Sequence, residues 1–293
     1  MTATGPLERY DRAAARSSAV VIGEYSTSFG LAVRLLPPAT RRHVRNVYAL
    51  VRLADEVVDG VAAAAGLPAD RIATALDELE ADTDRAMETG YSTNLVVHAF
   101  ATSARAVGIE RAIVTPFFAS MRMDLQRTTH TAASFAAYVD GSAEVVGLMC
   151  LRAFVAAGPP RSDAELARLE TGARRLGAAF QKVNFLRDLA ADSDGLGRAY
   201  FPDVDARRLD EATKERLVAD IDEDLAAAAA ALPLLERGPR RAVALAHGLF
   251  AALNDRIAAT PAETLRTTRV RVPDAEKARL AALAVAGRLP RRR

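Results

Sequence analysis

The stretch QKVNFLRDLAAD, which runs from Gln181 to Asp192, places two carboxylates four residues apart in a sequence otherwise typical of a helix. Residues four apart lie on the same face of an α-helix, so Asp188 and Asp192 point in the same direction. Gln181 and Asn184 extend this stripe toward the N-terminal end of the stretch. Carboxylates bind cations, and side-chain amides can hold the oxygens of a diphosphate or of metal-bound water. The stretch therefore predicts a helix with one polar, cation-binding face.

A second stretch, YALVRLADEVVD from Tyr48 to Asp59, has the same design. Tyr48, Arg52, Asp55 and Asp59 follow one another at helical spacing and form one continuous stripe. An aromatic ring, a cation and two carboxylates in a row suit neither a solvent-exposed helix face nor an apolar core. This stripe is therefore a second candidate for a functional surface.

Two carboxylate pairs that converge on one cavity repel each other unless cations neutralise them. Mg²⁺ is the natural candidate, since it prefers oxygen ligands and usually shares its coordination sphere with a substrate phosphate. Arg187, which lies beside the second of these pairs, could reach such a phosphate from the flank. The sequence therefore indicates a metal-bound diphosphate inside a helical protein. The alternative is that both stripes are solvated helix faces with ion pairs between successive turns.

The composition favours helices over sheets. Half of the 293 residues are hydrophobic, but only 5% are aromatic and tryptophan is absent, so Ala, Leu and Val must build the core. No alternating strand pattern of useful length appears. We expect a single all-α domain over residues 1–293, with eight to eleven helices, short flexible ends and a basic tail at 288–293. Predicted breaks between helices lie at Pro37-Pro38, Gly66 to Pro68, Gly90 to Thr93, Gly158 to Pro160, Pro202, Pro233, Gly238-Pro239 and Pro273.

The net charge and the cysteine content limit which partners the protein can have and in which compartment we expect it. A net charge of +2 gives no general attraction to nucleic acid. Cys150 is the only cysteine and lies in an apolar run, which predicts a buried structural thiol and a reducing, cytoplasmic location. No signal-peptide core and no uninterrupted run of 18 apolar residues is present, so we expect no transmembrane segment. The basic tail predicts a disordered end, with weak peripheral contact with an anionic membrane as the alternative.

Several segments together resemble the squalene/phytoene synthase family, and the resemblance covers nearly the whole chain. The two acidic stretches match the two Asp-rich motifs of that family. The other matching segments are YSTSF (25–29), MRMD (121–124), GSAEVVG (141–147, loosely), GRAYFP (197–202) and the basic RVRVP (269–273).

The resemblance implies an isoprenoid-synthase helical bundle around a central cavity, and a prenyltransferase that releases diphosphate from a prenyl diphosphate. It implies roles for eleven of the residues. Mg²⁺ would be held by Asp55, Asp59, Asp188 and Asp192. The diphosphate would be bound by Arg52, Arg187 and Arg269, with Tyr25, Gln181 and Asn184 around it. Tyr48 and Arg52 would act at the reacting end of the substrate.

The chain departs from the family pattern at Asp140. In the segment where the family has a Tyr-x-Tyr-like pair, this chain reads Tyr138, Val139, Asp140, Gly141. A carboxylate suits a hydrocarbon tunnel badly, but it can accept a hydrogen bond or a proton from a polar acceptor. A few relatives prenylate aromatic natural-product scaffolds such as carbazoles. We therefore expect Asp140 to be catalytic, with a slight preference for C-prenylation of an aromatic small molecule in secondary metabolism.

Three alternatives stay open at this point. Asp140 could instead face solvent or pair with a nearby arginine. The enzyme could join two prenyl diphosphates head to head, as a phytoene or squalene synthase does. The chain could also be a catalytically silent helical scaffold, which the complete acidic motifs disfavour. The prenyl chain length, the acceptor and the oligomeric state are left open by the sequence.

Overall fold

The computed structural model describes residues 5–156, 158–191 and 198–287. This part of the chain is helical, with eleven α-helices of eight or more residues and no strand beyond an isolated parallel bridge between Thr129 and Ala199. The prediction of an all-α fold is confirmed. The elements are α1 (Pro6–Tyr25), α2 (Ser28–Val33), α3 (Pro38–Val58), α4 (Val61–Ala64), α5 (Ala69–Thr89), α6 (Leu95–Val107), α7 (Arg111–Gln126), α8 (Ala132–Val139), the π-helix η1 (Asp140–Glu144), α9 (Val145–Val155), α10 (Asp163–Ala191), the 3₁₀ turns η3 (Ala206–Arg208) and η4 (Leu232–Leu234), α11 (Glu211–Ala231), α12 (Arg237–Ala259), α13 (Ala262–Leu265) and α14 (Asp274–Val285).

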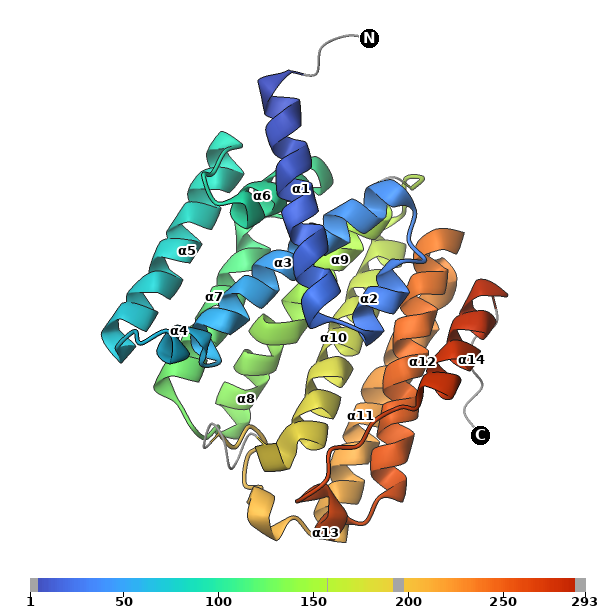
Figure 1. Cartoon of the computed structure of the whole chain (residues 1–293). Helices are drawn as coiled ribbons and strands as arrows, with labels where there is room; N and C mark the ends of the chain where they lie inside the picture. The colour runs from blue at the N-terminus through green and yellow to red at the C-terminus, as the bar shows by residue number, and fades with distance from the viewer. Residues whose placement is uncertain (1–4, 157, 192–197, 288–293) are drawn as a thin grey trace.

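The long helices form one bundle around α10 (Figure 1). Helix α10 packs against α11, α9, η1 and α12, whereas α3 packs against α1, α6 and α9. Helices α3 and α10 run in the same general direction. Both begin at the end of the bundle where α12 begins, and both run toward the opposite end, where α11 begins. Their C-terminal halves, which carry the acidic stretches, therefore lie at the same end.

Most helix boundaries fall where the sequence predicts a break. Helix α3 begins at Pro38, α5 begins directly after Pro68, and α14 begins directly after Pro273. The prediction at Gly238-Pro239 is wrong, because these residues lie in the first turn of α12. A proline is tolerated there, since the first N–H groups of a helix have no intrahelical partner.

Glycines let α9 and η1 approach α10 closely. A Cβ added to Gly147 would lie 2.3 Å from the carbonyl oxygen of Ala173, and one added to Gly177 would lie 2.3 Å from that of Ala143. No side chain fits at either position, so the backbones of these helices are in direct contact.

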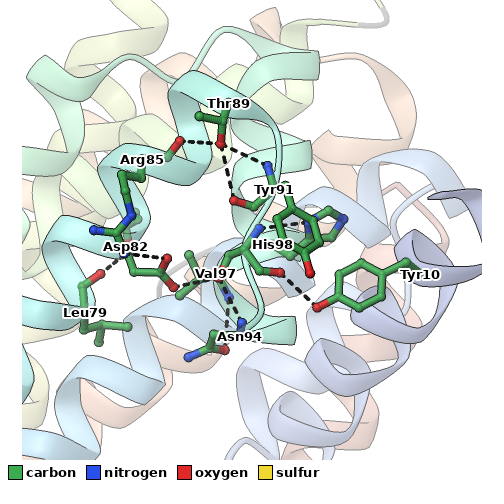
Figure 2. Close-up of polar contacts among 11 residues, drawn as sticks. Tyr10, Leu79, Asp82, Arg85, Thr89, Tyr91, Asn94, Val97 and His98 are labelled. Carbon is green, nitrogen blue, oxygen red and sulfur yellow. Dashed lines mark hydrogen bonds and ion pairs between the residues drawn. The ribbon is translucent and has the colours of Figure 1, made fainter.

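Helix α1 is fastened to the connection between α5 and α6 by a polar cluster (Figure 2). The Tyr10 hydroxyl donates to the carbonyl oxygen of Ser92 at 2.9 Å, and the ring of Tyr10 packs edge-on against His98. His98 is fully buried, and its Nε2 lies 2.7 Å from a carboxylate oxygen of Asp11. Its Nδ1 accepts a hydrogen bond from the backbone N–H of Ser92 at 3.4 Å. Nε2 therefore carries the ring proton and donates a hydrogen bond to Asp11. This cluster anchors α1 in its position against α3.

One stretch, Ala132–Val155, is long and apolar enough for a membrane span by length and composition. It comprises α8, η1 and α9, which pack against α7, α3 and α10 inside the bundle. These contacts identify it as a central helix of the fold.

Candidate active site

A cavity of about 290 Å³ lies in the middle of the bundle. Most of its lining is apolar and comes from α2, α3, η1, α9, α10, α11 and α12. The wall includes small residues such as Gly147, Gly172 and Gly177. Tyr48, Gln181 and Asn184 are among its few polar lining residues, and the role of the two amides in binding a diphosphate stays a prediction.

Both acidic stretches continue from this lining. Asp55 follows the lining residue Val51 by four positions, and Asp188 follows the lining residue Asn184 by four positions. Residues four apart lie on the same helix face, so both carboxylates lie one turn beyond the cavity wall. We call this end of the cavity the acidic mouth, defined by Asp55, Asp59 and Asp188.

On α3, the predicted aromatic and basic residues come together. The Arg52 guanidinium lies over the ring of Tyr25, 4.5 Å from its centroid, and it pairs with Glu56 one turn further on. Its Nε is buried and makes no hydrogen bond. Tyr48 stacks on Phe29 with ring centroids 5.6 Å apart, and burial raises the pKa of its hydroxyl. The buried, unpaired donor of Arg52 is therefore available to an anion.

The carboxylates of α3 lie in surroundings that disfavour their charge. Burial, together with the charges of the neighbouring Asp59 and Asp124, raises the pKa of Asp55 to about 8 against the opposing effect of Arg52. Burial also raises the pKa of Asp124, to about 6. An added cation would offset this mutual repulsion.

Arg198 connects three segments at the acidic mouth. Its Nη1 donates to Asp59 Oδ1 at 2.8 Å, and its Nη2 donates to the carbonyl oxygens of Val58 at 3.0 Å and Asp124 at 3.1 Å. The Arg198 side chain is only 9% exposed. It therefore fixes the C-terminal ends of α3 and α7 relative to each other.

Asp124 lies beneath this contact in an aromatic cluster. Tyr138 donates to Asp124 Oδ2 at 2.8 Å, and Tyr200 donates to Oδ1 at 3.2 Å. Phe185 of α10 stacks on Tyr200 with ring centroids 4.0 Å apart. Burial, together with the charge of Asp124, raises the pKa of both tyrosines, so their hydroxyls stay protonated as donors.

On α10, Asp188 is held by two predicted arginines. Arg269 Nε lies 2.7 Å from Asp188 Oδ1, and Arg187 Nε donates to the same oxygen at 2.9 Å. Three of the predicted residues are thus brought together from α10 and from the segment before α14. Asp192 lies outside the described residues.

Within the described part of the chain, no three His, Cys, Asp or Glu side chains lie close enough to hold one metal ion. Asp188 pairs with arginines, and Asp59 pairs with Arg198. Among the described residues, Asp55 and Asp59 at the C-terminal end of α3 and Asp188 of α10 therefore form two separate groups at one end of the cavity, and their convergence on one metal stays a prediction.

The expected position of Asp140 at the reacting centre is wrong. Asp140 begins η1 and is absent from the cavity lining, and its Oδ1 accepts from Arg174 Nη1 at 2.5 Å. Its side chain is 41% exposed. Tyr138, two positions earlier, instead donates to Asp124, in the cluster beside the acidic mouth. The reason for preferring an aromatic acceptor is therefore lost.

Asp124, Tyr138, Arg198 and Tyr200 were not predicted as site residues. Asp124 stands in the family-like segment MRMD, and Arg198 and Tyr200 stand in the family-like segment GRAYFP, but those motifs alone assign no partner. Asp124 also stands at the end of an otherwise mostly apolar helix, which is a signal for a buried, paired charge. Arg198 could not be found from spacing, because its partners lie up to 140 residues away.

Comparison with known proteins identifies the family of this chain. Residues 22–276 match the family model for squalene/phytoene synthase. A presqualene diphosphate synthase of Rhodopseudomonas palustris is 29% identical over 248 residues, covering 83% of this chain and 79% of that protein. A 15-cis-phytoene synthase of Paracoccus sp. is 31% identical over 191 residues, covering 64% and 59%. The chain spans less than half the length of plant phytoene synthases that it also matches.

Solved structures show the same fold. A dehydrosqualene synthase in complex with a ligand has a TM-score of 0.78 and 21% identity, covering 97% of this chain and 99% of that one. The squalene synthase HpnC from Alicyclobacillus acidocaldarius has a TM-score of 0.70 and 19% identity, covering 88% and 98%.

A helical bundle with an acidic mouth over an apolar cavity defines a helical prenyltransferase. The chain belongs to the squalene/phytoene synthase family, whose members are prenyltransferases that act on prenyl diphosphates with the help of divalent metal ions.

Proposed function

We propose that this enzyme joins two prenyl diphosphates head to head and releases diphosphate, with Mg²⁺ as its metal. The observation that carries the proposal is the arrangement of charge. Carboxylates and arginines gather at one end of a cavity whose remaining wall is apolar. The similarity to a presqualene diphosphate synthase and to phytoene synthases supports the same reaction.

The residues at the mouth fit Mg²⁺. Carboxylate oxygens are hard ligands, and the pKa of Asp55 is raised mainly by burial and then by the nearby Asp59 carboxylate, two effects that a bound cation would offset. Asp55 and Asp59 at the C-terminal end of α3 and Asp188 of α10 would hold the metal, together with Asp192, which lies outside the described residues. When bound, the metal supplies positive charge that favours departure of the diphosphate.

The protein contributes binding, orientation and the exclusion of water. Arg52, with its unpaired buried Nε, and Arg187 and Arg269 next to Asp188 would bind the diphosphate by charge-assisted hydrogen bonds. Gln181 and Asn184 would position it at the cavity wall. The apolar wall beyond them would shield an allylic carbocation from water until the second prenyl chain reacts.

Supplying the purified enzyme with Mg²⁺ and prenyl diphosphates alone tests this proposal. We expect release of diphosphate and formation of a cyclopropyl prenyl diphosphate or a linear hydrocarbon of twice the chain length. Farnesyl and geranylgeranyl diphosphate should be compared, with Asp55→Asn as the inactive control.

A parallel reaction with an indole or carbazole acceptor distinguishes head-to-head condensation from the alternative, aromatic prenylation. If products form only when the aromatic acceptor is present, the head-to-head proposal is wrong and aromatic prenylation replaces it. If correctly folded enzyme releases no diphosphate under any of these conditions, the chain is a scaffold.

A further inference from the structure

The end of the bundle opposite the acidic mouth carries an unusual concentration of arginine. The starts of α3 and α12 meet there, since a Cβ added to Gly238 would lie 2.8 Å from Pro37 Cγ. We call this surface the basic face. It comprises Arg34, Arg41, Arg42, Arg45, Arg237, Arg240 and Arg241.

Carboxylates do not balance this charge. No ion pair joins any of these seven arginines to a carboxylate in the part of the chain that the structure describes. Residues 25–54 and 237–254 contain no Asp or Glu at all. The acidic groups at this end are Glu236, which lies 3.5 Å from Arg161, and Asp163 and Glu165 at the start of α10.

Some of the arginines are pressed together. Partial burial lowers the pKa of Arg45, and the charges of Arg41 and Arg34 lower it further. The Nε of Arg45 and that of Arg241 are buried without a hydrogen-bond partner. Like charges held this close favour an external anionic partner, which would relieve their repulsion.

The basic face surrounds the apolar end of the cavity. Leu36, which lines the cavity, directly precedes Pro37, and the lining residues Ala242 and Val243 directly follow Arg241. Exposed prolines at 37, 38 and 233 add apolar surface between the arginines. Along α3, Arg42 and Asp59 are 17 residues apart, or about 25 Å at 1.5 Å per residue. The face is therefore well separated from the acidic mouth.

We propose that the basic face docks this protein on an anionic phospholipid bilayer, with the apolar end of the cavity turned toward the lipid. Charge complementarity selects anionic headgroups, and the prolines and cavity lining suit the adjoining apolar layer. The functional benefit of this orientation rests on the proposed function, because the product of a head-to-head reaction is a lipid that partitions from water into a membrane. The docking itself does not depend on it.

Vesicle co-sedimentation tests the docking. The test variant is Arg34→Gln/Arg42→Gln/Arg237→Gln, since these three side chains are exposed and make no ion pair in the described structure. The matched control is Arg71→Gln/Arg208→Gln/Arg216→Gln, which removes the same charge from exposed arginines at the starts of α5 and α11 and in η3, at the other end of the bundle.

We expect wild-type protein and the control variant to sediment with vesicles rich in phosphatidylglycerol but not with pure phosphatidylcholine vesicles. High salt should release them. The test variant should bind the anionic vesicles roughly tenfold more weakly or worse, since each arginine near the surface contributes independently. Circular dichroism and detergent-supported turnover of the test variant should equal those of wild type.

Three outcomes would overturn the proposal. Wild-type protein could fail to bind the anionic vesicles, both variants could lose binding equally, or duplex DNA could compete the vesicles away at stoichiometric concentration. Because binding is measured without substrate, loss of docking and loss of the proposed reaction are separate results.

Discussion

Asp55 shows, at the scale of single residues, how the fold creates a need for a cation. The metal-free folded protein holds a proton at Asp55 up to a pH of about 8, whereas the unfolded chain releases it near its ordinary value of 3.8. The folded state therefore binds more protons over this range, and the free energy of unfolding falls as the pH rises through it. A bound divalent cation would remove this loss.

Replacing Asp55 with Asn should separate activity from stability. Turnover should fall by roughly a hundredfold or more, because a metal ligand is lost. In EDTA at pH 8, the variant should be more stable than wild type by several kcal/mol, since it buries no charge and each unit of pKa shift corresponds to about 1.4 kcal/mol. At pH 4 the two proteins should be equally stable. Urea unfolding at both pH values measures this, and parallel pH profiles would contradict it.

Arg198 is a positioning residue at the same scale, because it holds Asp59 and the ends of α3 and α7. Arg198→Met should destabilise the protein by ~2 kcal/mol, as it leaves buried acceptors unpaired. It should also weaken activation by Mg²⁺ more than tenfold, because Asp59 loses its fixed orientation. Arg71→Met, at an exposed arginine, is the control. A variant with normal Mg²⁺ dependence would show that Arg198 is structural only.

At the scale of helices, the cavity depends on how closely α9 and η1 approach α10. Gly147 and Gly177 bring these backbones together while also lining the cavity. Larger residues elsewhere on the same helices, such as Phe154 and Phe180, then complete the wall. Small residues thus set the spacing of the helices, and large residues set the shape of the space between them.

Adding one methyl group at this contact should be costly. Gly147→Ala should destabilise the protein by ~1–3 kcal/mol, because the new Cβ would overlap the Ala173 carbonyl. Gly23→Ala in α1 is the matched control, since nothing lies within 4 Å of its added Cβ. The control should gain ~0.5 kcal/mol from reduced freedom of the unfolded chain. Thermal unfolding of both variants measures these changes in stability. Equal changes in the two variants would refute the close contact at Gly147.

At the scale of the whole molecule, α3 and α10 act together through a shared ligand. Their acidic groups lie at one end of the cavity but are not joined in a single metal site within the described residues. Metal and diphosphate would therefore link helices that otherwise meet only through the bundle. Binding energy of this kind adds directly to folding stability.

Mg²⁺ and inorganic diphosphate together should raise the melting temperature more than the sum of their separate effects. At concentrations about a hundredfold above the dissociation constant, the gain should be ~2.7 kcal/mol. Asp188→Asn should abolish this synergy, whereas Asp163→Asn, at the far end of α10, should retain it. EDTA should reverse the shift in wild type. Additive effects in wild type would mean that the two ligands do not share a site.

The sequence by itself determined the helical class, most helix boundaries and the two acidic stripes. These depend on local spacing, since residues four apart share a helix face and prolines limit where a helix can begin. It also placed Gln181, Asn184 and Arg187 on the same predicted helix as Asp188, and all four lie on α10.

Only the tertiary structure decided which side chains meet. Tyr138 donates to the buried Asp124, whereas Asp140, at the start of η1, pairs with Arg174. Arg198 reaches Asp59 across 139 positions of sequence, and no local pattern encodes that contact. Helical periodicity gives the direction of a side chain relative to its own helix. Packing between helices gives it a partner, and that depends on contacts from the whole chain.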